Sequence, residues 1–288
     1  MDYAYPKISV ITPSYNQGNF LEHTIKSVIE QNYPNLEYII IDGGSTDNSV
    51  DIMKKYEHNI DYWISEKDNG QTDAIMKGFQ KATGQYLAWL NSDDTYLQNC
   101  LLNVGDILAK NPDIDIIYGD YVITDVSGNT LLKKKEIPFD YNILLHGVNF
   151  IGQPTTFFSR DILERSGGLK TDLDYYMDWE FWLRAANHGA KFKHIKKYLA
   201  TYRYHAVSKT VKDHLVNIKC INEADEIHKI FLEKGIIYNK KLLNIIYRFK
   251  RQLTKLFYRG TVDIIPGLVF VWFYKKYKIK KDFINEFK

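Results

Sequence analysis

Short apolar runs alternate with amphipathic runs along the first third of the chain, and this alternation constrains the fold more than any other feature. Apolar runs at 7–13, 36–42 and 85–91 predict buried strands. Between them, apolar residues spaced three and four apart predict helices over 19–31 and 74–82. Strands that alternate with helices are typical of βαβ units, so the sequence predicts a mainly parallel sheet flanked by helices.

The pattern changes after residue 112, but further strands are expected at 115–125, 130–138 and 153–159. A long helix is expected over 210–234. We expect everything before that helix to share one sheet. The predicted fold class is therefore α/β, with a Rossmann-like central sheet.

The C-terminal part is strongly basic. From Lys240 to the end there are thirteen Lys/Arg against three Asp/Glu, a net charge of +10, in a chain whose total is +3. Apolar residues over 240–259 recur at helical spacing, and we place domain boundaries at 1–236 and 237–288. This basic helical extension predicts peripheral contact with a membrane; the alternative is packing on the main domain or in a homo-oligomer. No nucleic-acid-binding motif accompanies the charge, so no nucleic acid partner is expected.

Composition narrows the cellular setting. The N-terminus lacks the pattern of a signal peptide, and no apolar run reaches the ~18 residues of a spanning helix. Two cysteines at unrelated positions indicate a reducing compartment with buried thiols. We therefore expect a cytoplasmic protein that touches the inner face of the cell membrane through its basic tail.

Polar side chains follow three of the predicted strands. Thr12 and Tyr15 lie around the end of the first, Asp42 ends the second, and Asn91 and Asp93 follow the third. Because ligands bind at the carboxyl ends of strands in open α/β sheets, we expect these residues to meet at one cleft. Neither G-x-G-x-x-G nor a P-loop occurs, which disfavours dehydrogenases and P-loop kinases or ATPases.

Several spaced motifs in one order resemble family 2 glycosyltransferases, which are inverting enzymes of the GT-A fold. The segments are SVITPSYNQGNF, YIIIDGGSTDNS, LNSDD, QPTTFF, GGL, MDWEFWLRA and YRYHAVSKT. Together they span roughly residues 7 to 234. The resemblance implies a nucleotide-sugar donor, and the setting it suggests is bacterial surface-polysaccharide synthesis.

The resemblance assigns the donor side of the cleft. The family's D-x-D motif is Asn91-Ser92-Asp93 here, so Asp93 is the expected ligand of a divalent metal, Mn²⁺ or Mg²⁺, and Asn91 replaces the first acid. A cation held there would neutralise the diphosphate as it leaves. The residues expected to bind the nucleotide sugar are Thr12, Pro13, Tyr15, Asp42, Asp73, Asn91, Ser92 and Asp93. For Asp42 and Asp73, capping of a turn or helix is the alternative.

The YRYHAVSKT segment is expected to close on the diphosphate. Its Arg203, His205 and Ser208 could supply cationic and hydroxyl groups to the leaving group, with His205 also near the metal.

Attack by an acceptor hydroxyl requires a general base, and Asp178 is the predicted one. It matches the second residue of the family's E-D motif, whose first position is Met177 here. Glu180 is two residues further along the same helix, points elsewhere, and is expected to pair with Arg184 at i+4. Gln153 and Trp179 are expected on the acceptor side.

The resemblance thus implies an inverting transferase that moves a sugar from a nucleotide-sugar donor to a hydroxyl of a glycan or lipid-linked acceptor. Our first choice of donor is a UDP-sugar. One alternative is a sugar-1-phosphate nucleotidylyltransferase, although the Gly-rich basic loop it needs is absent from PSYNQGNF. The other is a non-catalytic nucleotide-sugar-binding protein or partner subunit, which only Asn91 favours.

Overall fold

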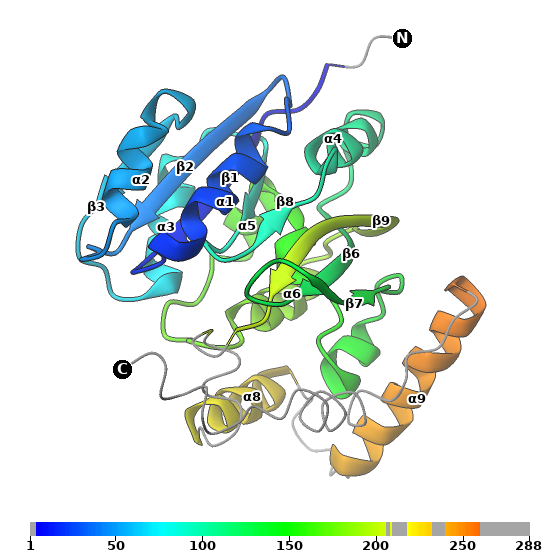
Figure 1. Cartoon of the computed structure of the whole chain (residues 1–288). Coiled ribbons are helices and arrows are strands. Elements are labelled where there is room, and N and C mark those ends of the chain that lie inside the picture. The colour runs from blue at the N-terminus through cyan, green and yellow to red at the C-terminus, as the bar shows by residue number, and fades with distance from the viewer. Residues whose placement is uncertain (1–3, 206–207, 209–217, 232–239, 260–288) are drawn as a thin grey trace.

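The computed structural model describes residues 4–205, 208, 218–231 and 240–259 (Figure 1). In chain order its elements are β1 (Ile8–Ser14), α1 (Gly18–Ile29), β2 (Leu36–Asp42), α2 (Ser49–Lys55), η1 (Glu57–Asn59), β3 (Tyr62–Ser65), α3 (Gln71–Lys81), β4 (Tyr86–Trp89), β5 (Thr95–Tyr96), α4 (Cys100–Lys110), β6 (Ile116–Thr124), β7 (Thr130–Lys134), η2 (Ile143–Gly147), η3 (Gln153–Thr155), β8 (Phe157–Ser159), α5 (Arg160–Arg165), α6 (Met177–Asn187), β9 (Phe192–Arg203), α8 (Ile218–Phe231) and α9 (Lys240–Arg259).

The strands form one nine-stranded sheet. Its order is β3-β2-β1-β4-β8-β6-β9-β5, and β7 pairs with β6 at the side. The first four strands in this order are parallel, as are β6 and β9, whereas β8 runs antiparallel between β4 and β6. The α/β class and the single sheet are therefore confirmed.

Helices cover both faces of the sheet because its strands are apolar on both sides. In β1, Ile11 packs in one cluster with residues of α3, α5 and α6. Its neighbour Val10 packs on the opposite face with residues of α1, α2 and α4. Successive strand residues point to opposite faces, so two neighbours in one strand anchor two different layers.

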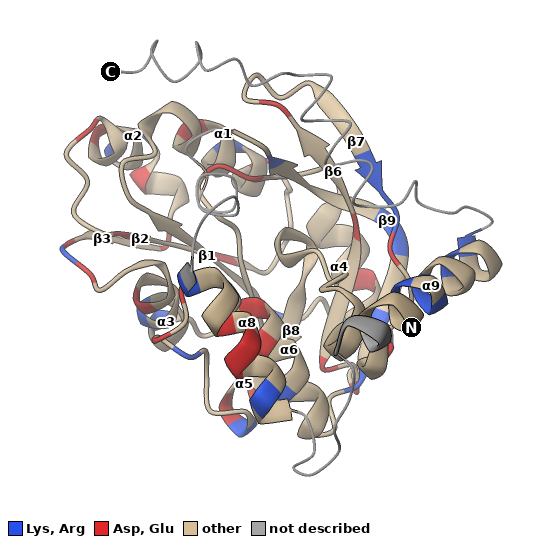
Figure 2. Cartoon of the chain, turned by 90° about the horizontal axis from the view of Figure 1, so that it is seen from below, with Lys and Arg blue, Asp and Glu red and all other residues tan. Residues whose placement is uncertain are grey.

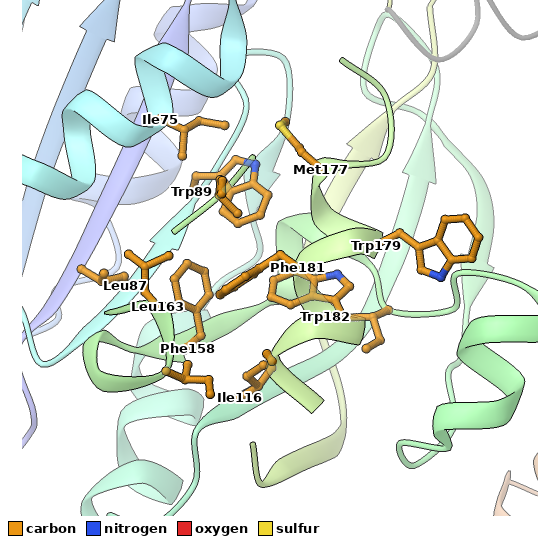
Figure 3. Packing of buried hydrophobic residues seen from close by; sticks show 14 of the residues in the cluster. Ile75, Leu87, Trp89, Ile116, Phe158, Leu163, Met177, Trp179, Phe181 and Trp182 are labelled. Carbon is orange, nitrogen blue, oxygen red and sulfur yellow. The ribbon is translucent and has the colours of Figure 1, made fainter. Parts of the chain in front are cut away.

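Aromatic packing fixes helix α6 against the sheet. Trp89 of β4 stacks on Trp182 of α6, with ring centroids 5.9 Å apart, and Phe158 of β8 meets both rings edge-on (Figure 3). Phe181 and Trp182 are fully buried. Trp179, on the same helix, points away from the stacked rings of Trp89 and Trp182 (Figure 3). Most residues of α6 are buried, so packing fixes the position of the helix whose first turn carries Asp178.

Three local features of the fold differ from the sequence analysis or are missing from it. The segment 153–159 is not one strand: η3 forms a 3₁₀ turn first, and only Phe157–Ser159 is extended. Helix α4 begins at Cys100 and follows Asn99, so the acidic loop at 93–94 does not cap it. Strand β9 was not predicted, because its lysines interrupt the alternation of a half-buried strand.

The C-terminal helix begins and ends where the sequence predicts it, at Lys240–Arg259. The boundary near residue 237 and the apolar segment 264–274 lie outside the described residues, and so does the first part of the helix predicted at 210–234. Within the described ranges, no helix is long and apolar enough to cross a membrane. Cys100 and Cys220 are buried free thiols, as expected.

Candidate active site

A large cleft opens where the carboxyl ends of β1 and β4 face η2 and the start of α6. Its volume is about 1220 Å³, which is larger than a site for one small molecule needs and leaves room for two substrates. The sequence-predicted residues in its lining are Pro13, Tyr15, Asn91, Ser92, Asp93, Gln153, Asp178, Trp179 and Ser208. The strand ends therefore meet at one cleft, as expected from the α/β pattern.

The acidic loop after β4 is held in place from two sides. Thr24 of α1 lies with its Oγ1 at 2.9 Å from Ser92 O and 2.7 Å from Asp94 O. The amide of Asn91 accepts a hydrogen bond from Gln71 Nε2 (2.8 Å) and donates one to Gln153 Oε1 (3.2 Å). An Asp at position 91 could not make that donation, so the sequence difference from D-x-D suits this network of amides.

Asp93, which lines the cleft, and His205, which is not part of its lining, form a pair that is compatible with a cation. The Asp93 Oδ2 and His205 Nε2 atoms lie 2.9 Å apart. The His205 side chain is 4% exposed, and its Nδ1 has no hydrogen-bond partner among the described residues. No cluster of three or more His, Cys, Asp or Glu occurs in the described ranges, so the protein offers a carboxylate and an imidazole rather than a full cage. This donor set fits a divalent cation whose remaining ligands are phosphate oxygens and water.

Arg203 reinforces this loop and does not line the cleft. Its Nε donates to Asp93 O (2.8 Å), and another guanidinium nitrogen donates to Val126 O (2.8 Å). Its backbone N–H donates to Asp94 Oδ1 (2.9 Å). The predicted direct contact of Arg203 with a diphosphate is therefore not supported by its position. Ser208 does line the cleft, and its hydroxyl donates to His205 O (2.9 Å).

Asp94 is a buried acid that sequence analysis could not assign. Burial, and then the neighbouring charge of Asp93, raise the pKa of this carboxyl well above its usual range. Its oxygens meet the backbone of Arg203 and the amide of Asn91. Asp94 thus ties the end of β9 to the acidic loop.

One of the nucleotide contacts predicted at the end of β1 proves to be internal to the fold. Thr12 is fully buried, and its hydroxyl lies 3.1 Å from Tyr38 OH in the layer below the cleft. Pro13 and Tyr15 reach the lining instead, and Tyr15 is 61% exposed. Side chains alternate across a strand, so the direction of Thr12 follows from the pleat.

Asp42 caps the turn that follows β2. It is fully buried, and its carboxylate accepts hydrogen bonds from Gly44 N, Ser45 N, Ser45 Oγ and Ser65 Oγ at 2.6–3.2 Å. Its neighbour Gly43 lines the cleft, whereas Asp42 does not. The turn-capping alternative is the one that matches this geometry.

Asp73 acts at the start of its own helix. Its Oδ2 accepts from Asn69 N (3.0 Å) and lies 3.6 Å from Lys77 Nζ. It is absent from the cleft lining, where Asp68 and Gln71 stand instead. The capping alternative again matches.

Asp178 lies in the cleft at the first turn of α6. Its Oδ2 accepts from Asn149 Nδ2 (3.1 Å), and its Oδ1 accepts from Trp179 N (2.7 Å). Burial raises the pKa of Asp178 to about 6, against the opposing effect of these two hydrogen bonds. A carboxylate that is ionised near neutral pH, yet holds a proton well, is suited to general base catalysis.

Glu180 points to the other side of α6. It is 1% exposed and pairs with Arg184 through two hydrogen bonds of 2.8 and 2.7 Å. This confirms the predicted i+4 pair and leaves Asp178 as the only acid of α6 in the cleft.

The far side of the cleft contains residues that the sequence did not reveal. Asn149 follows η2, and Asn244 and Arg248 come from α9. Asn244 Nδ2 donates to the carbonyls of His146 (3.1 Å) and Gly147 (2.9 Å), which joins α9 to η2. No motif marks these positions, because only the packing of α9 on η2 brings them to the cleft.

Gln153 and Trp179 both line the cleft. Gln153 donates from Nε2 to Trp89 O (2.7 Å), so it stands at the junction with the acidic loop. Trp179 donates from Nε1 to Leu144 O (2.9 Å) and exposes only 6% of its surface.

Comparison with known sequences gives the family. The sequence pattern of glycosyl transferase family 2 matches residues 9–167, more than half of the chain. An uncharacterized glycosyltransferase of Mycobacterium tuberculosis is 32% identical over 189 residues, which cover 63% of this chain and 69% of the relative. TuaG of Bacillus subtilis, a glycosyltransferase provisionally assigned to teichuronic acid biosynthesis, is 40% identical over 99 residues (33% and 39% of the two chains).

Solved structures give the fold. TarS 1–349 of S. aureus, in complex with UDP-GlcNAc, superposes with a TM-score of 0.65 at 15% identity, covering 88% of this chain and 76% of that one. The mannosyltransferase PcManGT of Pyrobaculum calidifontis, in complex with GDP-Man and Mn²⁺, gives 0.61 at 18%, covering 98% and 83%. The architecture is thus that of GT-A glycosyltransferases. The chain belongs to glycosyl transferase family 2, which excludes the nucleotidylyltransferase alternative.

Proposed function

We propose that the chain transfers a sugar from a UDP-sugar to a hydroxyl of a glycan or lipid-linked acceptor, with inversion, in the synthesis of a cell-surface polysaccharide. The name of TuaG supports the pathway, and the UDP-GlcNAc bound to TarS supports the donor. The observation that carries the proposal is that Asp93 and Asp178, from distant parts of the chain, line one cleft. One carboxylate serves the leaving group and the other serves the attacking hydroxyl.

On the donor side, Pro13 and Tyr15 border the space for the nucleoside, and Ser208 offers a hydroxyl to the phosphates. Asp93 and His205 would hold Mn²⁺ or Mg²⁺, and the imidazole ligand favours Mn²⁺. When bound, the cation neutralises negative charge on the departing diphosphate. Arg203 and Asp94 keep the Asp93 loop in position through their hydrogen bonds.

On the acceptor side, Asp178 takes the proton. The acceptor oxygen forms its bond to the anomeric carbon while the bond from that carbon to the diphosphate oxygen breaks. The hydroxyl proton passes to Asp178, and the diphosphate leaves with the bonding electron pair. A single displacement of this kind inverts the anomeric centre. Asn149 orients the carboxylate, while Gln153 and Trp179 border the acceptor.

Donor binding tests the donor side directly. Thermal unfolding of the full chain would be followed with UDP-, GDP-, dTDP- and CMP-sugars, with Mn²⁺ or with EDTA. We expect UDP-sugars to raise the melting temperature only with the metal, since saturation to 100 times Kd stabilises a folded protein by about 2.7 kcal/mol. Asp93→Asn should lose this metal-dependent shift, while Asp113→Asn, at an exposed acid on the surface, should keep it.

Two outcomes would change the proposal. A shift with GDP-sugars alone would replace UDP as the donor nucleotide. The absence of any shift from a folded chain would favour the partner-subunit alternative, because a nucleotide-sugar-binding protein would also show a shift.

A further inference from the structure

Helix α9 is docked with its polar face inward. Arg251 pairs with Glu136 and Arg259 with Asp120, and all four side chains are at most 7% exposed. Lys250 pairs with Asp140 at 2.6 Å. Most amphipathic helices bury their apolar stripe and turn their charges to water. The basic side of α9 is instead neutralised by carboxylates of the catalytic domain.

The opposite side of α9 is apolar and exposed. Its six outward residues, which we call the apolar face, are Ile245 (59% exposed), Ile246 (49%), Phe249 (64%), Leu253 (41%), Leu256 (45%) and Phe257 (86%). At 100° per residue they fall within an arc of about 120° on the helix. Figure 1 places α9 at the edge of the molecule remote from β2 and β3, so this face runs along an outer side. A continuous exposed apolar strip of this kind marks a contact surface.

Charge decides which partner fits. Residues 240–259 contain seven Lys/Arg and no Asp or Glu, and Figure 2 accordingly shows blue but no red on α9. Two copies that met through their apolar faces would bring the exposed cations Arg248 and Lys250 of one α9 toward those of the other, and α9 itself carries no acid. Arg248 and Lys250 are exposed beside the apolar face; Lys250 keeps 45% of its side chain exposed although it pairs with Asp140, so anionic lipid headgroups could meet both cations.

We propose that the apolar face of α9 inserts into the headgroup region of an anionic membrane, with the helix lying in the plane of the surface. Phe and Leu side chains then enter the acyl boundary, and cations at the edge of the strip meet the phosphates. The docked polar face holds the catalytic domain directly on the bilayer.

This orientation also concerns the cleft. Asn244 and Arg248, on α9 itself, line its acceptor side. A membrane-seated α9 therefore brings that side of the cleft close to the lipid surface. This consequence rests on the proposed function and favours an acceptor carried by a lipid, whereas the membrane contact itself does not depend on the donor chemistry.

Vesicle flotation with the full chain tests the contact. Vesicles of phosphatidylglycerol and phosphatidylethanolamine would be compared with vesicles of phosphatidylcholine alone. We expect binding to the anionic vesicles, weakened by high salt. The triple variant Ile246→Gln, Phe249→Gln, Phe257→Gln should bind at least about tenfold less, because it removes exposed apolar area without touching the buried ion pairs. Val126→Gln changes an exposed apolar residue that is far from α9 in sequence, and this variant should bind vesicles like wild type.

The shift in melting temperature with a nucleotide-sugar donor, compared with wild type, reports whether each variant is folded. A folded triple variant that binds vesicles like wild type would overturn the proposal. A wild-type chain that does not bind vesicles would also overturn it. Sedimentation of wild type and triple variant would then show whether the apolar face forms a dimer instead.

A labelled variant gives an independent measurement. Phe257→Cys can be labelled selectively, because Cys100 and Cys220 are buried. An environment-sensitive dye at this position should shift to the blue with anionic vesicles and be quenched by a lipid-borne quencher. A dye at Ile221→Cys, on the exposed side of α8, serves as the matched control and should respond much less. Equal responses at both positions would contradict insertion through α9.

Discussion

The acids next to the donor side of the cleft and the acid that lines its acceptor side are bonded in different ways. Neither Asp42 nor Asp73 lines the cleft: Asp42 accepts three hydrogen bonds from the turn after β2 and one from Ser65, and Asp73 accepts one at the start of its own helix. On the acceptor side, Asp178 accepts one hydrogen bond from a side chain and one from the adjacent backbone N–H, and burial raises its pKa to about 6. All three are acids near the ends of strands or the starts of helices.

The difference teaches how to separate acids that build a site from acids that react in it. A carboxylate whose hydrogen bonds all come from a turn and a neighbouring strand, as at Asp42, holds that turn in place. A buried carboxylate that lines a cleft, as at Asp178, has a raised pKa and can take a proton from a substrate. Hydrogen-bond partners and a place in the cleft therefore distinguish Asp42 from Asp178.

The largest effect is expected for Asp178→Asn. An amide cannot accept the proton of the acceptor hydroxyl, so transfer should fall by about 10²–10⁴-fold, the usual contribution of a general base. Donor binding should persist, because the cation-compatible pair Asp93 and His205 is unchanged. Single-turnover transfer and the thermal shift with donor measure the two separately.

Asp172→Asn is the matched control, since this exposed acid precedes the same helix. It should transfer like wild type. Full transfer by Asp178→Asn would assign the base to another group and remove the distinction drawn between the two sides.

Asp42→Asn should show the opposite behaviour, with lost stability and retained donor affinity. The amide must turn its NH₂ group toward groups that donate, and losing charge-assisted hydrogen bonds at a buried acid costs about 2–3 kcal/mol. Urea unfolding measures the loss. Asp61→Asn is the control, because this exposed acid accepts one backbone hydrogen bond, from Tyr38 N, and its replacement should cost less than about 1 kcal/mol.

The result also decides between the two roles considered for Asp42. A stable Asp42→Asn variant that no longer binds donor would restore the nucleotide contact expected from the family resemblance. A less stable variant with normal affinity would establish it as a turn residue.

Sequence alone predicted the donor half of the fold well. Strands β1, β2 and β4 and helices α1 and α3 are regular βα units, in which burial follows from local periodicity. The pair of Glu180 and Arg184 was predictable for the same reason, since i+4 neighbours on a helix always meet.

The acceptor half depended on contacts that no local pattern carries. Asn149 reaches Asp178 across 29 positions, and Asn244 reaches Gly147 across 97. The amphipathic pattern of α9 was evident from the sequence. However, the helical spacing of apolar residues shows only that a helix has an apolar and a polar face, not which of them is buried. Carboxylates such as Glu136, far away in sequence, determine that the polar one turns inward.

The smallest effect concerns the pH dependence of the base. Asp178 must be deprotonated to act, so kcat/KM should fall tenfold per unit as the pH drops below about 6. The hydrogen bond from Asn149 lowers the pKa of Asp178, so Asn149→Leu should raise that pKa and move the acidic limb upward by about one unit, at about 1.4 kcal/mol per unit. Asn149→Ser keeps a donor and should recover part of the shift.

Since Asn149 also borders the cleft, the plateau of kcat/KM at high pH is the decisive control. An unchanged plateau means that Asn149 acts through the ionisation of Asp178, whereas a lowered plateau with an unmoved limb would make it an acceptor contact instead.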